Sequence, residues 1–247
     1  QGEDIKDLAK EYADLNGDSL VNVSAEERKK ALVDYALPKN IKKMQADMEK
    51  YKIFYDKWFF ESELHKSGAV KAVVDLLTEK GLTYEKDGAV WYKNKEVLTQ
   101  KLLKEGKSQK YIDNLELKDD VLIRQNGNPT YFTADIAYHK NKFDRGFTTL
   151  IDVWGADHHG HVMRMKGAMD AIGYDGDKLN VVLMQLVKLV KDGELVRMSK
   201  RTGKAIQLGD LLDEVPVDSA RFLFNTKEAN TQMDFDLDLA VSQDNQN

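Results

Sequence analysis

The sequence has no cysteine, which excludes disulfide bonds and thiolate metal sites and is compatible with the reducing cytosol. It also lacks any apolar run close to the roughly 20 residues that a membrane helix needs, and no signal-peptide pattern opens it. Positive charge is not in excess either: the formal net charge is −5, which argues against a protein that coats nucleic acid indiscriminately. We therefore expect a cytoplasmic protein without membrane contact, in which any contact with nucleic acid is confined to a local patch.

Apolar and charged residues are both plentiful, at 42% and 32% of 247 residues, so the chain is long enough for one large domain or two small ones. After residue 120, apolar strand-like segments alternate with polar turns and helical segments, a pattern that predicts a parallel α/β sheet. Strands are expected at 121–124, 129–133 and 148–154, a further buried segment at 179–189, and helices at 135–143 and 162–172. Ligands of such sheets lie at the carboxyl ends of the strands.

The first 120 residues carry local signals for several elements. A helical pattern opens the chain and ends at Asn16-Gly17, and the capping box Ser24-Ala-Glu-Glu27 opens a second helix through about Leu37. Pro38 is expected to kink or restart it, and the apolar face that continues toward Tyr51 is expected to lie in the core. The remaining expectations are a buried aromatic strand at 53–60, a helix at 67–79, a hairpin at 82–92 turning on Asp87-Gly88, and a helical insertion or mobile loop at 94–119.

A cationic segment follows the tight turn expected at Asp192-Gly193. The residues Arg197-Met198-Ser199-Lys200-Arg201 place three cations and a hydroxyl beside Thr202-Gly203. Short charge clusters are usually solvated, so composition alone favours a basic surface hairpin. Such a loop can also close over a polyanion, because Gly203 lets the backbone swing and cations neutralise charge that grows on phosphate oxygens. The residues alone leave both interpretations open.

Four titratable residues crowd the end of the strand expected at 148–154: Asp157, His158, His159 and His161. Metal ligands usually come from separated elements, and adjacent side chains diverge in direction, so we predict no metal site here. A strand end that leads into a helix N-terminus offers amides and imidazole donors. This arrangement suits a nucleotide better than a metal.

Tyr131 and Asp135 stand four residues apart where a strand is expected to meet a helix. An aspartate near a helix start is most often a cap. At this spacing the two side chains can also face one pocket, where a carboxylate pairs with a guanidinium and a tyrosine stacks or donates a hydrogen bond.

Several segments resemble class I aminoacyl-tRNA synthetases, and arginyl-tRNA synthetases in particular. Met198-Ser199-Lys200 resembles the KMSKS loop of that class, with Arg197 where the first lysine usually stands. Trp154-Gly-Ala-Asp-His-His-Gly-His161 and Tyr131-Phe-Thr-Ala-Asp135, continued through His139, resemble segments of arginyl-tRNA synthetases, as do 215–224 and 233–240. The order of these motifs identifies the chain as a member of that family, and the resemblance is strongest over 121–240.

The resemblance implies a role for individual residues. Tyr131 and Asp135 would bind the side chain of arginine, and His158 would form a wall between amino acid and nucleotide. The residues implied for ATP are Gly155, Asp157, His161, Met198 and Lys200. Lys200, Ser199 and Arg197 would stabilise the transition state. The resemblance implies a monomeric arginine–tRNA ligase. Its implied substrates are arginine and ATP, its cofactor is Mg²⁺, and its partner is tRNA(Arg).

The implied fold is a Rossmann-type catalytic domain with an incomplete parallel sheet and an α+β insertion. Its expected parts are a helical segment at 1–52, a strand–helix–hairpin part with the insertion at 53–120, the second half of the nucleotide-binding domain at 121–224, and the start of a connection to an anticodon-binding domain at 225–247. The family's His-Ile-Gly-His motif has no match in the chain. The sequence is therefore interpreted as an internal fragment, inactive by itself.

Two other functions stay open. A nucleotidyltransferase with the same ancestral fold would bind ATP without preferring arginine. A non-catalytic module derived from a synthetase would bind nucleotide or RNA and would explain the missing motif. A titration with arginine against lysine separates the first from a ligase.

Overall fold

The structure is a computed structural model that describes residues 2–196 and 206–242. It divides into two compact units: one combines Gln1–Asp56 with Leu186–Asn247, and the other is Lys57–Gln185. Among the residues described, no helix has the length and apolarity that crossing a bilayer requires. The four-part division of the sequence follows family segments rather than compactness, and it stays a prediction.

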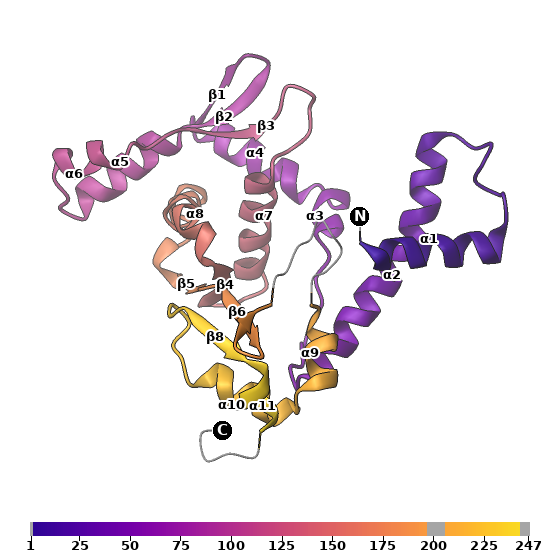
Figure 1. The fold of residues 1–247 in the computed structure, drawn as a ribbon. Coiled ribbons are helices and arrows are strands. Elements are labelled where there is room, and N and C mark those ends of the chain that lie inside the picture. The colour runs from indigo at the N-terminus through magenta and orange to yellow at the C-terminus, as the bar shows by residue number, and fades with distance from the viewer. Residues whose placement is uncertain (1, 197–205, 243–247) are drawn as a thin grey trace. The chain divides into compact units, whose positions relative to one another are not determined.

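Two helices open the first unit, α1 (Glu3–Asn16) and α2 (Ala25–Lys50) (Figure 1). α1 ends at Gly17, whose φ of 54° lies in the left-handed region that glycine adopts readily. The predicted capping box is confirmed: the Ser24 hydroxyl accepts from the Glu27 amide at 3.2 Å, and the Ser24 amide donates to the Glu27 carboxylate at 3.0 Å. Each group thereby satisfies an amide that the helix leaves without a partner.

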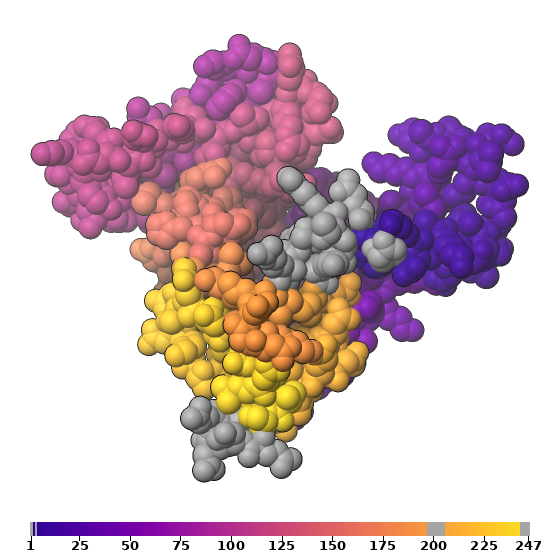
Figure 2. Space-filling model, in the orientation of Figure 1, coloured from indigo at the N-terminus to yellow at the C-terminus, as the bar shows by residue number. Residues whose placement is uncertain are grey.

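The structure corrects two expectations for α2. The helix does not restart at Pro38 but continues through it to Lys50, while the alternative of a kink at Pro38 stays a prediction. The structure describes every residue of α2, and none of them is buried. The methionines and aromatic residues of this helix therefore do not form a core; Met44, for example, is 46% exposed. These helices, indigo to purple in Figure 2, show much of their surface to solvent.

The first unit has its own sheet, in the order β7-β6-β8. The strands are β6 (Val187–Lys191), β7 (Glu194–Leu195) and β8 (Met233–Asp236), and β6 pairs in parallel with β8. Asp192 and Gly193, with φ of 53° and 74°, form the predicted tight turn between β6 and β7. Three helices complete this core: α9 (Leu208–Glu214), α10 (Val217–Asn225) and α11 (Leu237–Val241). Phe235 is fully buried at its centre.

The second unit contains an antiparallel sheet, β1 (Thr83–Lys86), β2 (Ala89–Tyr92) and β3 (Asp120–Ile123). The hairpin turns on Asp87 and Gly88 as predicted, both with positive φ. Between β2 and β3 lie α5 (Asn94–Lys104) and α6 (Gln109–Asn114), so 94–119 is a helical insertion and not an irregular loop. Before the hairpin come α3 (Glu61–Lys66), which the sequence did not predict, and α4 (Ala69–Glu79).

A parallel pair of strands, β4 (Leu150–Gly155) and β5 (Leu179–Met184), confirms the predicted parallel α/β arrangement. α7 (Tyr131–Asp144) and α8 (His159–Ile172) flank it, with the short helices η1 (Ala156–His158) and η2 (Gly176–Lys178) in the connections. One core contains buried side chains of α4, α7, α8 and β5, including Leu77, Ile136, Met165 and Leu179. These contacts fix the helices that carry the site described below.

The expectations of a strand at 53–60 and of one buried segment at 179–189 were also wrong. The aromatic segment 53–60 is irregular, and Phe54 is 75% exposed, because its apolar side chains do not meet a neighbouring strand here. The expected single segment 179–189 is two strands, since the chain leaves the second unit at Gln185 and β6 begins in the first unit.

Candidate active site

α7 begins earlier than the sequence predicted. The stretch 129–133 was expected to be a strand, but only Pro129 bridges β3, at Ile123, and the helix starts at Tyr131. Two hydroxyls on the first turn explain this, because Thr130 donates to the Val121 carbonyl at 2.8 Å and Thr133 donates to the Leu122 carbonyl at 2.7 Å. These bonds fix the helix start against β3, and they depend on tertiary contacts that periodicity does not report.

Tyr131 and Asp135 consequently lie on successive turns of one helix, where residues four apart share a face. Thr130 occupies the N-cap position, so the common interpretation of Asp135 as a cap is wrong. The Tyr131 side chain is 78% exposed, whereas Asp135 is half-buried. One oxygen of the Asp135 carboxylate, Oδ2, lies 3.2 Å from Nε2 of His161.

The end of β4 carries the second group of predicted residues. Gly155 closes the strand, Asp157 lies in η1, and α8 begins at His159 rather than at residue 162. His161 therefore belongs to the first turn of α8, and its ring lies between Phe132, at 5.6 Å, and Trp154, at 5.2 Å between ring centroids.

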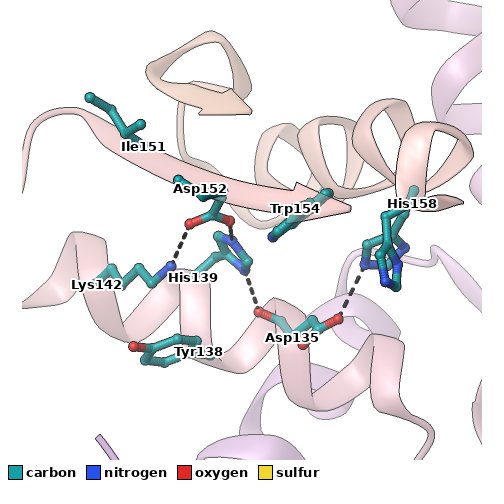
Figure 3. Close-up of a pocket in the computed structure, with 10 residues that line it drawn as sticks. Asp135, Tyr138, His139, Lys142, Ile151, Asp152, Trp154 and His158 are labelled. Carbon is teal, nitrogen blue, oxygen red and sulfur yellow. Dashed lines mark hydrogen bonds and ion pairs between the residues drawn. The ribbon is translucent and has the colours of Figure 1, made fainter. Parts of the chain in front are cut away.

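Two adjoining pockets bring these side chains together. One, of about 470 Å³, is lined by Tyr131, Phe132, Asp135, Asp157, His158, Gly160, His161 and Arg164. The other, of about 420 Å³, shares Asp135, His158 and His161 with it and extends along α7 and β4 (Figure 3). Tyr131, Asp135, Asp157, His158 and His161 thus converge from both predicted motifs, whereas His159 lines a different pocket.

Arg164, which the sequence analysis did not single out, places a cation at the rim of the first pocket. Its guanidinium lies 4.8 Å from the centre of the Phe132 ring and binds both oxygens of Asp120, with Nε 3.0 Å from Oδ2. Burial raises the pKa of Asp120 above its usual range, although Arg164 opposes this. Because one carboxylate already neutralises Arg164, the cation can turn toward an anionic ligand only by giving up part of that pairing.

The sequence also missed a buried charge cluster, formed by His139, Lys142 and Asp152 (Figure 3). His139 is 3% exposed and Asp152 is 7% exposed. The two side chains are hydrogen-bonded through His139 Nε2 and Asp152 Oδ2, and Lys142 Nζ donates to Asp152 Oδ1 at 2.7 Å. Burial pushes the pKa of Asp152 upward, but His139 and Lys142 outweigh it and hold that pKa below its usual range. An aspartate inside the apolar run Leu150–Trp154 was the signal available in the sequence.

The predicted cationic loop cannot be placed against these pockets. Arg197, Met198, Ser199 and Lys200 lie outside the described residues. Within 2–196 and 206–242, no group of three or more acidic or histidine side chains is arranged to hold a metal ion.

The family described as class I tRNA synthetases (R), catalytic domain, matches residues 24–243. The chain belongs to the class I arginyl-tRNA synthetase family. Among curated relatives, it is 54% identical to the arginine–tRNA ligase of Caldanaerobacter subterraneus and 51% identical to that of Ruminiclostridium cellulolyticum. All of the chain aligns in both cases, but it spans only 41% of the length of each relative.

Solved structures agree on the class I synthetase fold. A Campylobacter jejuni protein, itself assigned as an arginyl-tRNA synthetase, is 35% identical with a TM-score of 0.81, over 100% of this chain and 49% of that one. The Thermus thermophilus arginyl-tRNA synthetase is 18% identical with a TM-score of 0.66, over 88% of this chain and 44% of that one, and supports the fold alone. The predicted family and fold class are therefore confirmed.

Proposed function

We propose that the full-length protein is an arginine–tRNA ligase, which activates arginine with ATP and transfers it to tRNA(Arg). The observation that carries this proposal is the convergence of Asp135, Tyr131 and His158 on one pocket, at the end of the strand that leads into α8. The chain spans 41% of its curated relatives, so the activity is proposed for the whole protein. This stretch by itself lacks a His-Ile-Gly-His motif, and we expect it not to activate arginine.

Asp135 is proposed to bind the guanidinium of arginine. A carboxylate accepts about four hydrogen bonds, so Asp135 can pair with a guanidinium while His161 occupies one position on Oδ2. Tyr131 lies one turn earlier on the same face and is exposed, which leaves its ring and hydroxyl available to a ligand. His158, whose side chain is 60% exposed, lies at the rim of both pockets, where we propose that it separates the amino acid from the nucleotide.

ATP is proposed to bind where β4 leads into α8. Gly155, Asp157 and His161 lie at this junction, and the amides of a helix N-terminus favour an anion. The proposed contacts are those of Asp157 and His161 with the ribose or adenine. Met198 and Lys200 are proposed to contact ATP from the cationic loop, on the sequence similarity alone.

In the first step, the arginine carboxylate attacks the α-phosphorus of ATP; the bond to pyrophosphate breaks, and arginyl-adenylate forms. Negative charge grows on the phosphate oxygens, and Lys200, Ser199 and Arg197 are proposed to stabilise it. One preorganised donor of this kind contributes about 3 kcal/mol to the barrier reduction. In the second step, a ribose hydroxyl at the tRNA 3′ end takes the arginyl group and releases AMP.

The remaining proposals concern the surroundings of the reaction. Mg²⁺ is proposed to arrive with ATP, since it binds largely through substrate phosphates, and the described residues supply no ligand group of their own; no step is routed through it. We propose a monomer located in the cytoplasm, a compartment compatible with a chain without cysteine.

Arginine-dependent exchange of pyrophosphate into ATP, measured on the full-length protein with tRNA(Arg) present, tests the proposal. We expect exchange with arginine and none with lysine. Exchange that does not depend on the amino acid would favour a nucleotidyltransferase, and ATP binding without exchange would favour a non-catalytic module.

A further inference from the structure

His139 contacts the residue proposed to bind arginine. Its Nδ1 lies 2.7 Å from the backbone oxygen of Asp135, one helical turn earlier. In an α-helix this oxygen already accepts from the amide of the residue four positions later, which is His139 itself. The side chain therefore adds a second bond between the same two residues. This double connection restricts the turn of α7 from which the Asp135 side chain projects.

Both nitrogens of His139 are hydrogen-bonded. Nδ1 donates to the Asp135 carbonyl, which can only accept. Nε2 is hydrogen-bonded to Oδ2 of the Asp152 carboxylate. Asp152 lies on β4, and the ring thus connects the strand to the turn that carries Asp135, as Figure 3 shows.

Lys142 fixes the far end of this chain of contacts. Its ammonium donates to the second oxygen of Asp152 at 2.7 Å and lies 4.5 Å from the centre of the Tyr138 ring. With both oxygens bonded, the Asp152 carboxylate has one orientation in which it satisfies both partners. The orientation of the His139 ring follows from that of Asp152.

Stability alone does not account for this buried charge cluster. Replacing buried ion pairs with well-packed apolar side chains is often neutral or stabilising, because desolvation offsets the attraction between the charges. Asp152 and His139 nevertheless line the same pocket as Asp135 and His161. Binding residues of high selectivity need supporting contacts that hold them within a fraction of an ångström.

We propose that His139 is a positioning residue for Asp135, held in turn by Asp152 and Lys142, and that the buried charge cluster thereby determines selectivity for arginine. This inference rests on the proposed function. His139 fixes Asp135 through its backbone, while His161 contacts its side chain. A guanidinium then meets a carboxylate whose direction is set before binding.

The test compares variants of the full-length protein in the pyrophosphate-exchange assay with tRNA(Arg). For His139→Gln we expect the KM for arginine to rise about tenfold or more, because small misplacements of a binding group are costly, while the KM for ATP stays within about twofold. The ratio of kcat/KM for arginine to that for its neutral analogue citrulline should fall. His65→Gln is the matched control, since His65 is exposed on α3.

A double variant separates positioning from a merely structural role. In an Asp135→Asn background, His139→Gln should add little to the KM for arginine, because the group that it positions has been changed. Equal rises in both KM values, an unchanged arginine KM, or a full effect in the Asp135→Asn background would overturn the inference. If His139→Gln does not fold, Lys142→Gln tests the same chain of contacts, with Lys140→Gln on the same helix as control.

The outcomes distinguish this inference from the function on which it rests. A wild-type protein without arginine-dependent exchange overturns both. An active wild-type protein whose His139 and Lys142 variants keep the arginine KM and the citrulline ratio overturns the positioning role alone.

Discussion

Replacing Asp135 with asparagine tests the assignment of the arginine site most directly. Asparagine has nearly the same shape and keeps an oxygen that can accept from His161 Nε2, now 3.2 Å from Asp135 Oδ2. The fold should therefore be preserved, while the negative charge that would meet a guanidinium is removed. The variant should therefore lose only the part of the binding free energy that comes from the negative charge of Asp135.

The size of this loss depends on how exposed the Asp135 side chain is. Hydrogen bonds to charged groups contribute about 1.5–3 kcal/mol. The Asp135 side chain is 44% exposed, so solvent screens its charge. We therefore expect its contact with the guanidinium to contribute near the lower end of that range, at about 1.5–2 kcal/mol. We therefore expect kcat/KM for arginine to fall roughly 10–30-fold, with most of the effect in KM.

Pyrophosphate exchange at varied arginine and saturating ATP measures both constants, and circular dichroism of the variant checks that it is folded. The ATP KM serves as the internal control, since Asp135 is assigned no contact with the nucleotide. If arginine KM and kcat of a folded Asp135→Asn variant equal those of the wild type, Asp135 does not bind the guanidinium.

Four further predictions concern stability. Asp152→Asn should lower the free energy of unfolding by about 3 kcal/mol in urea titrations at pH 7, because it removes the buried charge that is bonded to both His139 and the partly buried Lys142; a loss below that of a Lys140→Gln control on the same helix would refute this. The folded-state pKa of Asp152 is lowered, so its stabilisation is present above the unfolded pKa and is lost as pH falls through the folded value; the wild type should lose stability below about pH 4 more steeply than Asp152→Asn, and parallel curves would contradict this. Gly176→Ala should cost about 2 kcal/mol in the same titrations, because the new Cβ would lie 2.3 Å from the Lys166 backbone oxygen, whereas Gly160, with nothing within 4 Å, should accept alanine without loss. Ser24→Ala should cost about 1 kcal/mol by removing the cap of α2, and an unchanged thermal midpoint would show that the cap contributes nothing.

Elements whose cause is local were predicted well from the sequence. The capping box at Ser24 and the turns at Asp87-Gly88 and Asp192-Gly193 depend on neighbours within a few residues, and all three are confirmed. The segment 53–60 was predicted wrongly, because aromatic composition is typical of burial but does not supply a strand partner. At Pro38 the alternative of a restarted helix was wrong, since α2 continues through this residue.

The sequence predicted those residues of the candidate site that belong to the recognised motifs, and no others. Tyr131, Asp135, Asp157, His158 and His161 converge as the resemblance implied, although their roles stay predictions. His139 and Asp152 are thirteen residues apart and come together only because α7 packs beside β4. No periodicity in the sequence reports which helix turn faces which strand residue, so such a pair becomes visible only in three dimensions.

The hydrogen bond between Asp135 and His161 joins a residue assigned to the amino acid with one assigned to the nucleotide. A first ligand that alters this bond changes the surroundings that a second ligand encounters. Thermodynamic reciprocity then requires that arginine alter the affinity for ATP by the same factor as ATP alters the affinity for arginine. The order in which the two substrates arrive would leave that factor unchanged.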